Sequence, residues 1–427
     1  MNLVSDPMSF LTKLFEAAVD AARPEAVISQ YLPEKPKGRV VVIGAGKASA
    51  QMGRAFEQAW MERHGECVEG LIVTRYDYGC ECKSLEVIEA AHPVPDEAGE
   101  TGALRLLDAV SDLTEDDLVV ALISGGGSAL LPCPPGDLTL NDEIAVNKAL
   151  LASGAPISAM NTVRKHISGI KGGRLAIAAY PAKVVSLLVS DIPGDHAQYI
   201  ASGPTVADSG SRQDALSIVD NYEMQLPDRV MKYLASSDAD APHPDDARLA
   251  KVEHHIIASA AKSLEAAETL ARDNGIEAHI LSDSIEGEAR EAALTQASMA
   301  KEILYRDRPF KKPVVLLSGG ETTVTLKGKG KGGRNTEFLL SFALAIAGET
   351  GVQVLCADTD GIDGSEDNAG AFVDGNTTSK MRAVGVDPVS ALQNNDAWSA
   401  FDKAEALFIP GPTGTNVNDF RAILITG

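Results

Sequence analysis

Short apolar runs, each ending in a glycine-rich turn before a helical pattern, restrict this chain to a narrow range of folds. The first is Arg39–Ile43, where Gly44-Ala45-Gly46-Lys47 leads into a helix predicted at Ala48–Met61. The same order returns where Leu118–Ile123 precedes Ser124-Gly125-Gly126-Gly127-Ser128. Short strands that alternate with longer helices are typical of α/β proteins with a mostly parallel sheet.

The same pattern continues along the whole chain. The other predicted strands are Gly70–Val73, Val184–Val189, His255–Ala258, Glu277–Leu281, Val314–Leu317, Val352–Cys356, Leu407–Ile409 and Ile423–Ile425. The other predicted helices are Phe10–Ala22, Gly99–Leu107, Asp142–Ala152, Ala260–Asn274, Gly287–Tyr305 and Thr336–Ala347. A length of 427 residues suits two domains. The polar, proline-rich stretch Ser236–Arg248 suits a linker, so we predict domains at 1–245 and 246–427.

Composition limits the partners of the chain. There are 38 basic and 60 acidic residues, which gives a formal net charge of -22. Such a field repels nucleic acid and anionic lipid, so an anionic substrate needs a local cluster of cations and backbone N–H groups. No apolar run reaches the roughly 20 residues of a membrane span. No signal peptide pattern opens the chain, and five cysteines are too few for a disulfide framework, so we expect a cytoplasmic protein.

Two glycine turns are candidate anion sites. Gly44 and Gly46 allow a ligand to approach the backbone at the start of a helix, and Lys47 adds a positive charge. Three glycines between Ser124 and Ser128 (Gly125, Gly126 and Gly127) expose N–H groups that suit phosphate oxygens. Tight turns without any ligand are the plainer interpretation. The first turn lacks the spacing of a P-loop and the third glycine of a dinucleotide fingerprint.

A weaker echo of these turns occurs in the second half of the chain. Ser318-Gly319-Gly320-Glu321 follows a predicted strand, and Glu321 could hold a cation or a hydroxyl group. Lys331-Gly332-Gly333-Arg334 repeats Lys171-Gly172-Gly173-Arg174 of the first half. Cations beside glycines suit anion capture, although solvated loops have the same composition.

Aspartates at the ends of two predicted strands indicate the type of reaction. Asp191 follows Val184–Val189, and Asp358 and Asp360 follow Val352–Cys356. Open α/β sheets bind ligands at this end of the strands. Carboxylates facing phosphate sites suit magnesium-dependent phosphoryl transfer, with Asp358 and Asp360 as metal ligands, since magnesium takes one or two carboxylates and bridges phosphates. The alternative is that these aspartates only cap turns and helices.

Taken together, these motifs resemble the class II glycerate kinases, whose C-terminal half carries the MOFRL domain. The resemblance covers nearly the whole chain and also includes His92-Pro93-Val94-Pro95, Ser190–Asp195 and Gly411–Asp419, a polar loop in which Asn416 is a candidate substrate contact. It implies a Rossmann-like N-terminal domain with a parallel sheet and a smaller α/β C-terminal domain, with a cleft between them. The implied reaction is phosphorylation of D-glycerate by ATP and Mg²⁺, typically at the 2-hydroxyl.

The resemblance also implies roles for individual residues. The lysine and arginine of the family correspond to Lys47 and Arg334, and its strand-end aspartates to Asp191 and Asp358. We expect Lys47 and Arg334 to neutralise the transferring phosphoryl group and Asp191 to orient or deprotonate the hydroxyl group of the substrate. Relatives have also been labelled hydroxypyruvate reductases, so NAD(P)H-dependent reduction is the main alternative. A kinase for another small hydroxy acid and a non-catalytic nucleotide- or sugar-acid-binding protein are the others, and the sequence gives no basis for an oligomeric state.

Overall fold

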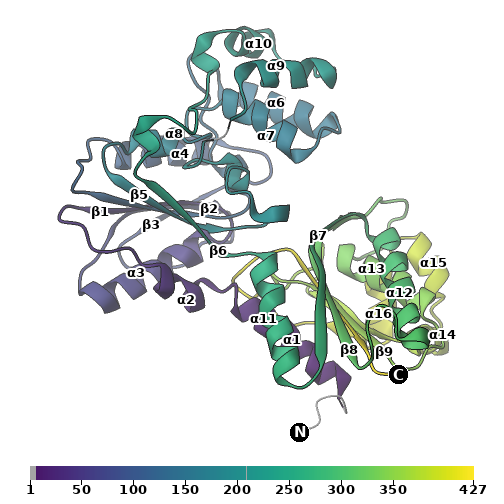
Figure 1. The fold of residues 1–427 in the computed structure, drawn as a ribbon. Coiled ribbons are helices and arrows are strands. Elements are labelled where there is room, and N and C mark those ends of the chain that lie inside the picture. Colours follow the sequence, from purple (N-terminus) through teal and green to yellow (C-terminus); the bar gives the residue numbers. More distant parts are fainter. Residues whose placement is uncertain (1–5, 208) are drawn as a thin grey trace. The chain divides into compact units, whose positions relative to one another are not determined.

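The computed structural model describes residues 6–207 and 209–427, which form two compact units (Figure 1). The N-terminal unit is Val27–Ile257. The C-terminal unit combines Met1–Ala26, of which residues 6–26 are described, with Ala258–Gly427. This division differs from the predicted boundary near residue 245, because strand β6 (Val252–Ala258) still belongs to the first sheet. It also differs at the start of the chain, where the first helix packs in the C-terminal unit.

A six-stranded sheet in the order β3-β2-β1-β4-β5-β6 forms the centre of the N-terminal unit. Its strands are β1 (Val40–Ala45), β2 (Glu69–Arg75), β3 (Glu86–Ala90), β4 (Leu118–Ile123), β5 (Lys183–Val189) and β6. Strands β1 to β5 pair in parallel, which confirms the predicted Rossmann-like sheet. All six residues of β4 are buried, as expected for a strand covered on both faces. Strand β3 was not predicted.

Helices cover this sheet and build a separate layer beside it (Figure 1). Helix α2 (Pro24–Val27) spans the point in the sequence where one unit ends and the other begins. The helices of the N-terminal unit are α3 (Ser49–His64), α4 (Glu97–Ala109), α5 (Gly127–Leu130), α6 (Leu140–Ala152), α7 (Ile157–His166), α8 (Arg174–Ala178), α9 (Arg212–Asn221) and α10 (Asp228–Leu234). Helices α6, α7, α9 and α10 share their own core, which contains Val146, Leu150, Val163, Val219 and Leu234. This second core explains why α7, α9 and α10 form although their sequence periodicity did not predict them.

The C-terminal unit has a mixed six-stranded sheet in the order β11-β10-β9-β12-β8-β7. Its strands are β7 (Glu277–Glu288), β8 (Val314–Thr323), β9 (Val352–Asp358), β10 (Gly370–Asp374), β11 (Leu407–Phe408) and β12 (Asp419–Ile425). Only β7 and β8 pair in parallel, and the other pairs are antiparallel. The mostly parallel pattern expected for the whole chain is therefore wrong for this unit. The last strand, β12, inserts between β8 and β9.

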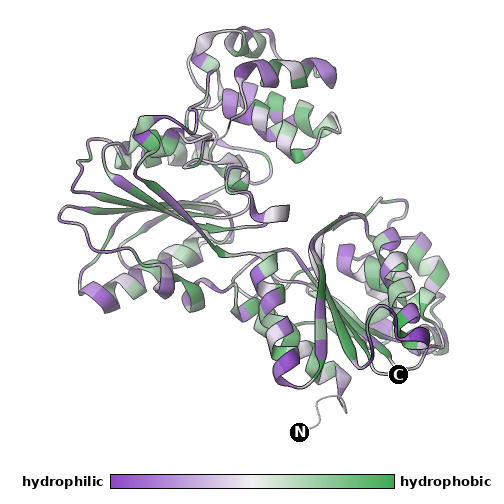
Figure 2. Cartoon of the chain, viewed as in Figure 1, coloured by the Kyte–Doolittle hydropathy of each residue, from purple (hydrophilic) through white to green (hydrophobic). Residues whose placement is uncertain are grey.

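Apolar helix faces and strands form the core of the C-terminal unit. Its helices are α1 (Pro7–Asp20), α11 (Ala260–Asp273), α12 (Ala289–Arg306), α13 (Arg334–Ala345), α14 (Thr377–Ala383), α15 (Pro388–Gln393) and α16 (Ala397–Lys403). Figure 2 shows hydrophobic colouring along the central strands of both units and polar colouring on outward helix faces. The ring of Phe15 on α1 lies 5.0 Å from that of Phe408 and 5.9 Å from that of Phe420, so α1 closes this core. Across the described residues, no helix combines the length and the apolar character needed to cross a membrane.

Candidate active site

Loops that leave the carboxyl ends of β1 and β4 interlock in the N-terminal unit. The N–H of Ser124 donates to the carbonyl of Ala45 (3.0 Å), and the N–H of Lys47 donates to the carbonyl of Gly125 (2.9 Å). The hydroxyl of Ser124 accepts the N–H of Ala48 at 3.0 Å and is 1% exposed. Ser124 therefore holds the two loops together and does not present its side chain to solvent.

Close packing explains three of the glycines in these loops. A Cβ atom on Gly44 would lie 2.8 Å from the carbonyl oxygen of Leu122, and one on Gly46 would lie 2.1 Å from the hydroxyl of Ser124. A Cβ atom on Gly127 would lie 2.7 Å from that of Ala201. Gly44, Gly46 and Gly127 thus allow close approach of neighbouring strands and loops. The partly exposed glycines are Gly125 and Gly126.

Three functional side chains gather around Gly125 and Gly126. A Cβ atom on Gly126 would lie 3.2 Å from Cγ of Lys47 and 3.3 Å from the ring of His92. One on Gly125 would lie 1.8 Å from Oδ2 of Asp191, which follows β5. Adjacent parallel strands β1, β4 and β5 thus bring together Lys47, the glycine turn and Asp191, as strand order in an open α/β sheet permits.

Lys47 contributes a positive charge to this cluster. Within the described part of the chain, the Lys47 ammonium forms no ion pair, so its charge is available to a ligand. Burial, with the positive charges of Lys47 and Arg75, lowers the pKa of His92 to about 4. His92 is therefore a neutral imidazole at pH 7, able to donate or accept a hydrogen bond without adding charge. The sequence singled out the His92-Pro93 motif but gave His92 no role.

The two Lys-Gly-Gly-Arg motifs have different functions in the structure. Lys171 is 1% exposed, and its ammonium donates to Glu143 and to the carbonyl of Leu131, both at 2.8 Å. Arg174 donates to the carbonyl groups of Lys165 and Asp240. Anion capture by this first motif is therefore wrong: both cations are used inside the fold.

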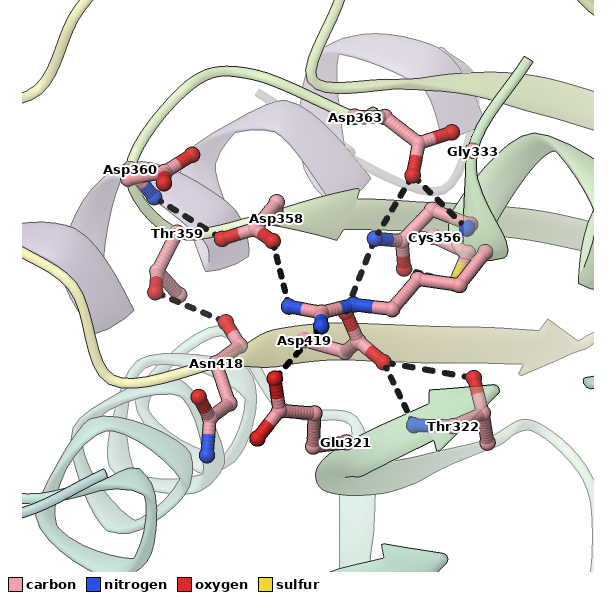
Figure 3. A network of polar contacts seen from close by, with 12 residues as sticks. Glu321, Thr322, Gly333, Cys356, Asp358, Thr359, Asp360, Asp363, Asn418 and Asp419 are labelled. Carbon is pink, nitrogen blue, oxygen red and sulfur yellow. Dashed lines mark hydrogen bonds and ion pairs between the residues drawn. The ribbon is translucent and has the colours of Figure 1, made fainter. Parts of the chain in front are cut away.

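The second motif places Arg334 among the carboxylates of Asp419, Glu321 and Asp358. Figure 3 shows these three carboxylates close together. The guanidinium of Arg334 donates from Nε to Asp419 (2.8 Å), from Nη1 to Glu321 (2.7 Å) and from Nη2 to Asp358 (2.7 Å). Strand register explains the convergence, since Asp419 of β12 lies opposite Asp358 of β9 and Gly320 of β8. These three carboxylates raise the pKa of Arg334 although burial opposes the shift, so it stays positively charged.

Asp363 positions Arg334 by capping helix α13. Its carboxylate accepts the N–H groups of Asn335 (2.9 Å) and Thr336 (2.8 Å) and the hydroxyl of Thr336. A Cβ atom on Gly333 would lie 2.3 Å from the same carboxylate, which explains this glycine. The N-terminus of α13 is thus satisfied by the protein itself, and the side chain of Arg334 extends into the carboxylate cluster.

Asp358 and Asp360, the predicted metal ligands, occupy one turn. The N–H of Asp360 donates to Oδ1 of Asp358 at 3.2 Å, and the Asn416 side chain donates to Asp360 at 3.3 Å. Burial, with the negative charges of Asp360 and Asp419, raises the pKa of Asp358, while Arg334 opposes this rise. A further cation near this turn would relieve the repulsion between the two carboxylates.

The segment Ser318–Gly320 is not a turn. It lies inside β8, with Ser318 opposite Arg421, Gly319 opposite Phe420 and Gly320 opposite Asp419 of β12. The predicted phosphate nest there is wrong, because the backbone of this segment takes part in sheet pairing on both sides. Gly320 instead permits close approach of β7, since a Cβ atom would lie 2.2 Å from the carbonyl oxygen of Ile285.

Comparison with known proteins gives the family. Residues 10–235 match "Domain of unknown function (DUF4147)", and residues 314–419 match the "MOFRL family". A D-glycerate 2-kinase from Thermotoga maritima is 41% identical over 97% of each chain, and a putative hydroxypyruvate reductase from Agrobacterium vitis is 48% identical over 97% of this chain and 94% of its own. The crystal structure of a glycerate kinase from T. maritima matches with a TM-score of 0.90 and 40% identity, covering 98% of this chain and 99% of that one. The chain belongs to the class II glycerate kinase family.

This membership confirms the family inferred from the motifs and makes the chain a small-molecule kinase. In phosphoryl transfer from nucleotides, a divalent metal commonly neutralises charge on the nucleotide phosphates. Among residues 6–207 and 209–427 there is no group of three or more His, Cys, Asp and Glu side chains that could hold an ion. Asp358 and Asp360 still fit magnesium, which takes few protein carboxylates and completes its shell with water and phosphate oxygens.

Two residues in contact with the Arg334 cluster were not predicted as site residues from the sequence. Asp419 was noted only as the end of the polar loop, yet it binds Arg334 and the fully buried Arg421. Asn335 donates to Asp419 at 2.9 Å and accepts from the thiol of Cys356 at 2.8 Å. The signal for Asp419 was its place directly before an apolar run, but only the insertion of β12 between β8 and β9 brings it to Arg334.

Proposed function

We propose that the chain catalyses the ATP- and Mg²⁺-dependent phosphorylation of D-glycerate at its 2-hydroxyl, giving 2-phosphoglycerate. The observation that carries the proposal is the arrangement of Lys47, which forms no ion pair with any described residue, and Asp191 around the glycine turn 125–126. Relatives named D-glycerate 2-kinase and glycerate 2-kinase, at 41% and 40% identity, support the substrate and the position.

Each group has a defined task in this proposal. Asp191 accepts the proton of the glycerate hydroxyl as the hydroxyl oxygen bonds to the γ-phosphorus and the bond to ADP breaks. Lys47 neutralises negative charge on the transferring phosphoryl group. In the C-terminal unit, Asp358 and Asp360 would hold magnesium, which supplies charge neutralisation to the nucleotide phosphates. Arg334 contributes a positive charge that its three carboxylates keep in place.

We also propose that the enzyme works in the reducing environment of the cytoplasm on small molecules alone. All five cysteines are free thiols in the structure. Reducing compartments favour this state.

Two assays on one purified sample test the proposed reaction. The first combines ATP, magnesium and D-glycerate and detects ADP, and the second combines NADH or NADPH with hydroxypyruvate. We expect ADP release that requires both glycerate and magnesium, with no oxidation of the reduced cofactor, and NMR of the product should show phosphate at the 2-position. Cofactor oxidation without ADP release would replace the kinase proposal by the reductase that some relatives' names suggest.

Replacing Lys47 by alanine is expected to lower kcat by on the order of a hundredfold, the effect of removing one preorganised positive group from a transition state. The free energy of unfolding should change little, because Lys47 forms no ion pair among the described residues. Initial rates and thermal unfolding measure the two effects.

Lys37→Ala provides the matched control in the same unit. Its side chain is 89% exposed and its ammonium lies 3.8 Å from Asp116, so kcat should stay near the wild-type value. If Lys47→Ala and Lys37→Ala give the same kcat, Lys47 has no role in the transition state.

A further inference from the structure

Backbone strain marks the segment Ala201–Gly203 of the N-terminal unit. Ala201, Ser202 and Gly203 have φ angles of 51°, 60° and 62°, so three consecutive residues adopt the left-handed region. For alanine and serine this conformation costs free energy and persists only where the surrounding structure enforces it. Here the Cβ atom of Ala201 packs on Gly127, and Ser202 is 1% exposed. The strained segment thus lies directly against the glycine turn.

The side chain of Ser202 joins this turn to helix α7. Its hydroxyl donates to Oδ1 of Asn161 at 3.0 Å and lies 2.8 Å from the hydroxyl of Ser128. Asn161 is 2% exposed, whereas Ser128 is partly exposed at the surface of the turn. A chain of three polar side chains therefore runs from the interior of the unit to the loop that carries Gly125 and Gly126.

The partners of the buried Asn161 side chain determine which group donates in each of these hydrogen bonds. Arg164, which can only donate, bonds to Oδ1 of Asn161 at 3.2 Å, and the Asn161 amide nitrogen donates to the carbonyl of Tyr199 at 3.5 Å. Oδ1 is thus the acceptor for Ser202. The single proton of Ser202 is used there, so Ser128 must donate its own proton to Ser202. Only lone pairs of the Ser128 oxygen then remain for a ligand.

We propose that Ser128 determines substrate specificity by accepting a hydrogen bond from the glycerate hydroxyl that is not phosphorylated, and that Ser202 and Asn161 position it. This inference rests on the proposed function. Glycerate carries two hydroxyl donors, and the acceptors of the loop region include the carboxylate of Asp191 beside Gly125 and the oxygen of Ser128. A phosphate or carboxylate oxygen needs a donor, so Ser128 is poorly suited to the anion contact that the sequence suggested.

The test compares D-glycerate with D-lactate, which keeps the carboxylate and the 2-hydroxyl but has a methyl group at carbon 3. A site built to bind a hydroxyl rejects the analogue without it, because its acceptor is left unpaired. We expect wild-type kcat/KM to favour D-glycerate by at least about tenfold. In Ser128→Ala that preference should fall to within about threefold of unity. An equal preference in wild type and Ser128→Ala would overturn the proposal.

Variants of Ser202 and Asn161 test whether these residues orient the Ser128 hydroxyl or only stabilise the fold. Asn161→Asp keeps an acceptor for Ser202 and should keep the glycerate preference. Ser202→Ala and Asn161→Leu free the proton of Ser128 to turn outward, so both should reduce the preference. A preference that survives in Ser202→Ala and Asn161→Leu, or is lost in Asn161→Asp when the variant is folded by circular dichroism, would overturn the positioning role.

A binding measurement keeps this inference separate from the proposed reaction. Calorimetric titration of the full chain with D-glycerate and with D-lactate gives the affinity ratio without any turnover. If no phosphoryl transfer occurs but the affinity ratio is high and falls in Ser128→Ala, the kinase proposal fails and the role of Ser128 stands. Phosphoryl transfer can also occur while Ser128→Ala changes neither the kcat/KM ratio nor the affinity ratio of D-glycerate to D-lactate. In that case the role of Ser128 fails and the kinase proposal stands.

Discussion

Replacing Arg334 by alanine is expected to lower the free energy of unfolding of the C-terminal unit by about 3 kcal/mol. The guanidinium is shared by Asp419, Glu321 and Asp358, and the side chains of Asp419 and Asp358 are 0% and 6% exposed. Removing one partner of a buried ion pair leaves charge that water cannot solvate, which is more costly than losing the pair itself. Arg421 still pairs with Asp419 in this variant. Most of the lost free energy of unfolding therefore comes from the unpaired carboxylate of Asp358.

The same variant should lower kcat by on the order of a hundredfold, if Arg334 also neutralises charge on the phosphates. Urea unfolding followed by circular dichroism gives the stability, and steady-state kinetics give kcat. The control is Lys331→Ala, three residues earlier in the same loop. Lys331 is 56% exposed, pairs with Glu366 at 3.1 Å and lies over the ring of Trp398, so its removal should cost under about 1 kcal/mol. Equal losses for both variants would contradict the central role of Arg334.

Local patterns predicted the parts of the fold that depend on local sequence. The strands β1, β4 and β5 and the turns after them were found because apolar runs and glycines are visible within a few residues. Strand β3 was missed because Glu86 and Glu89 interrupt its apolar run. Strand β10 was missed because Gly370-Ala371 weakens its β-propensity, and only its place beside β9 stabilises it.

Features that depend on contacts between distant parts of the chain could not be predicted from the sequence. Helix α1 is amphipathic from its sequence alone, but its packing on Phe408 and Phe420 depends on strands about 400 residues later. The carboxylate cluster of Arg334 likewise needs Asp358, Glu321 and Asp419 from three strands. Lys47 and Asp191 could be predicted, because each directly follows a strand of a parallel sheet and such ends lie at one edge.

Gly125→Ala is expected to lower kcat by on the order of a hundredfold or more in a variant that remains folded. Gly125 does not have a positive φ angle, so its backbone conformation is open to alanine. The new Cβ atom would lie 1.8 Å from Oδ2 of Asp191, so the carboxylate must leave its present position beside the turn. A general base that leaves its position loses the contribution of positioned proton transfer. Steady-state kinetics give kcat, and thermal unfolding of the same sample shows whether the variant is folded.

Gly79→Ala is the matched control for this effect. Its Cβ atom would lie 2.8 Å from Oε1 of Glu89, so the substitution also displaces a flexible carboxylate of the N-terminal unit, but one outside the Lys47 and Asp191 cluster. Its kcat should stay within a few-fold of wild type. A normal kcat in Gly125→Ala would show that the position of Asp191 beside the turn is not needed for proton transfer. A normal kcat in Gly79→Ala with a large loss in Gly125→Ala would attribute the effect to Asp191, because both variants add the same methyl group and displace the same kind of side chain.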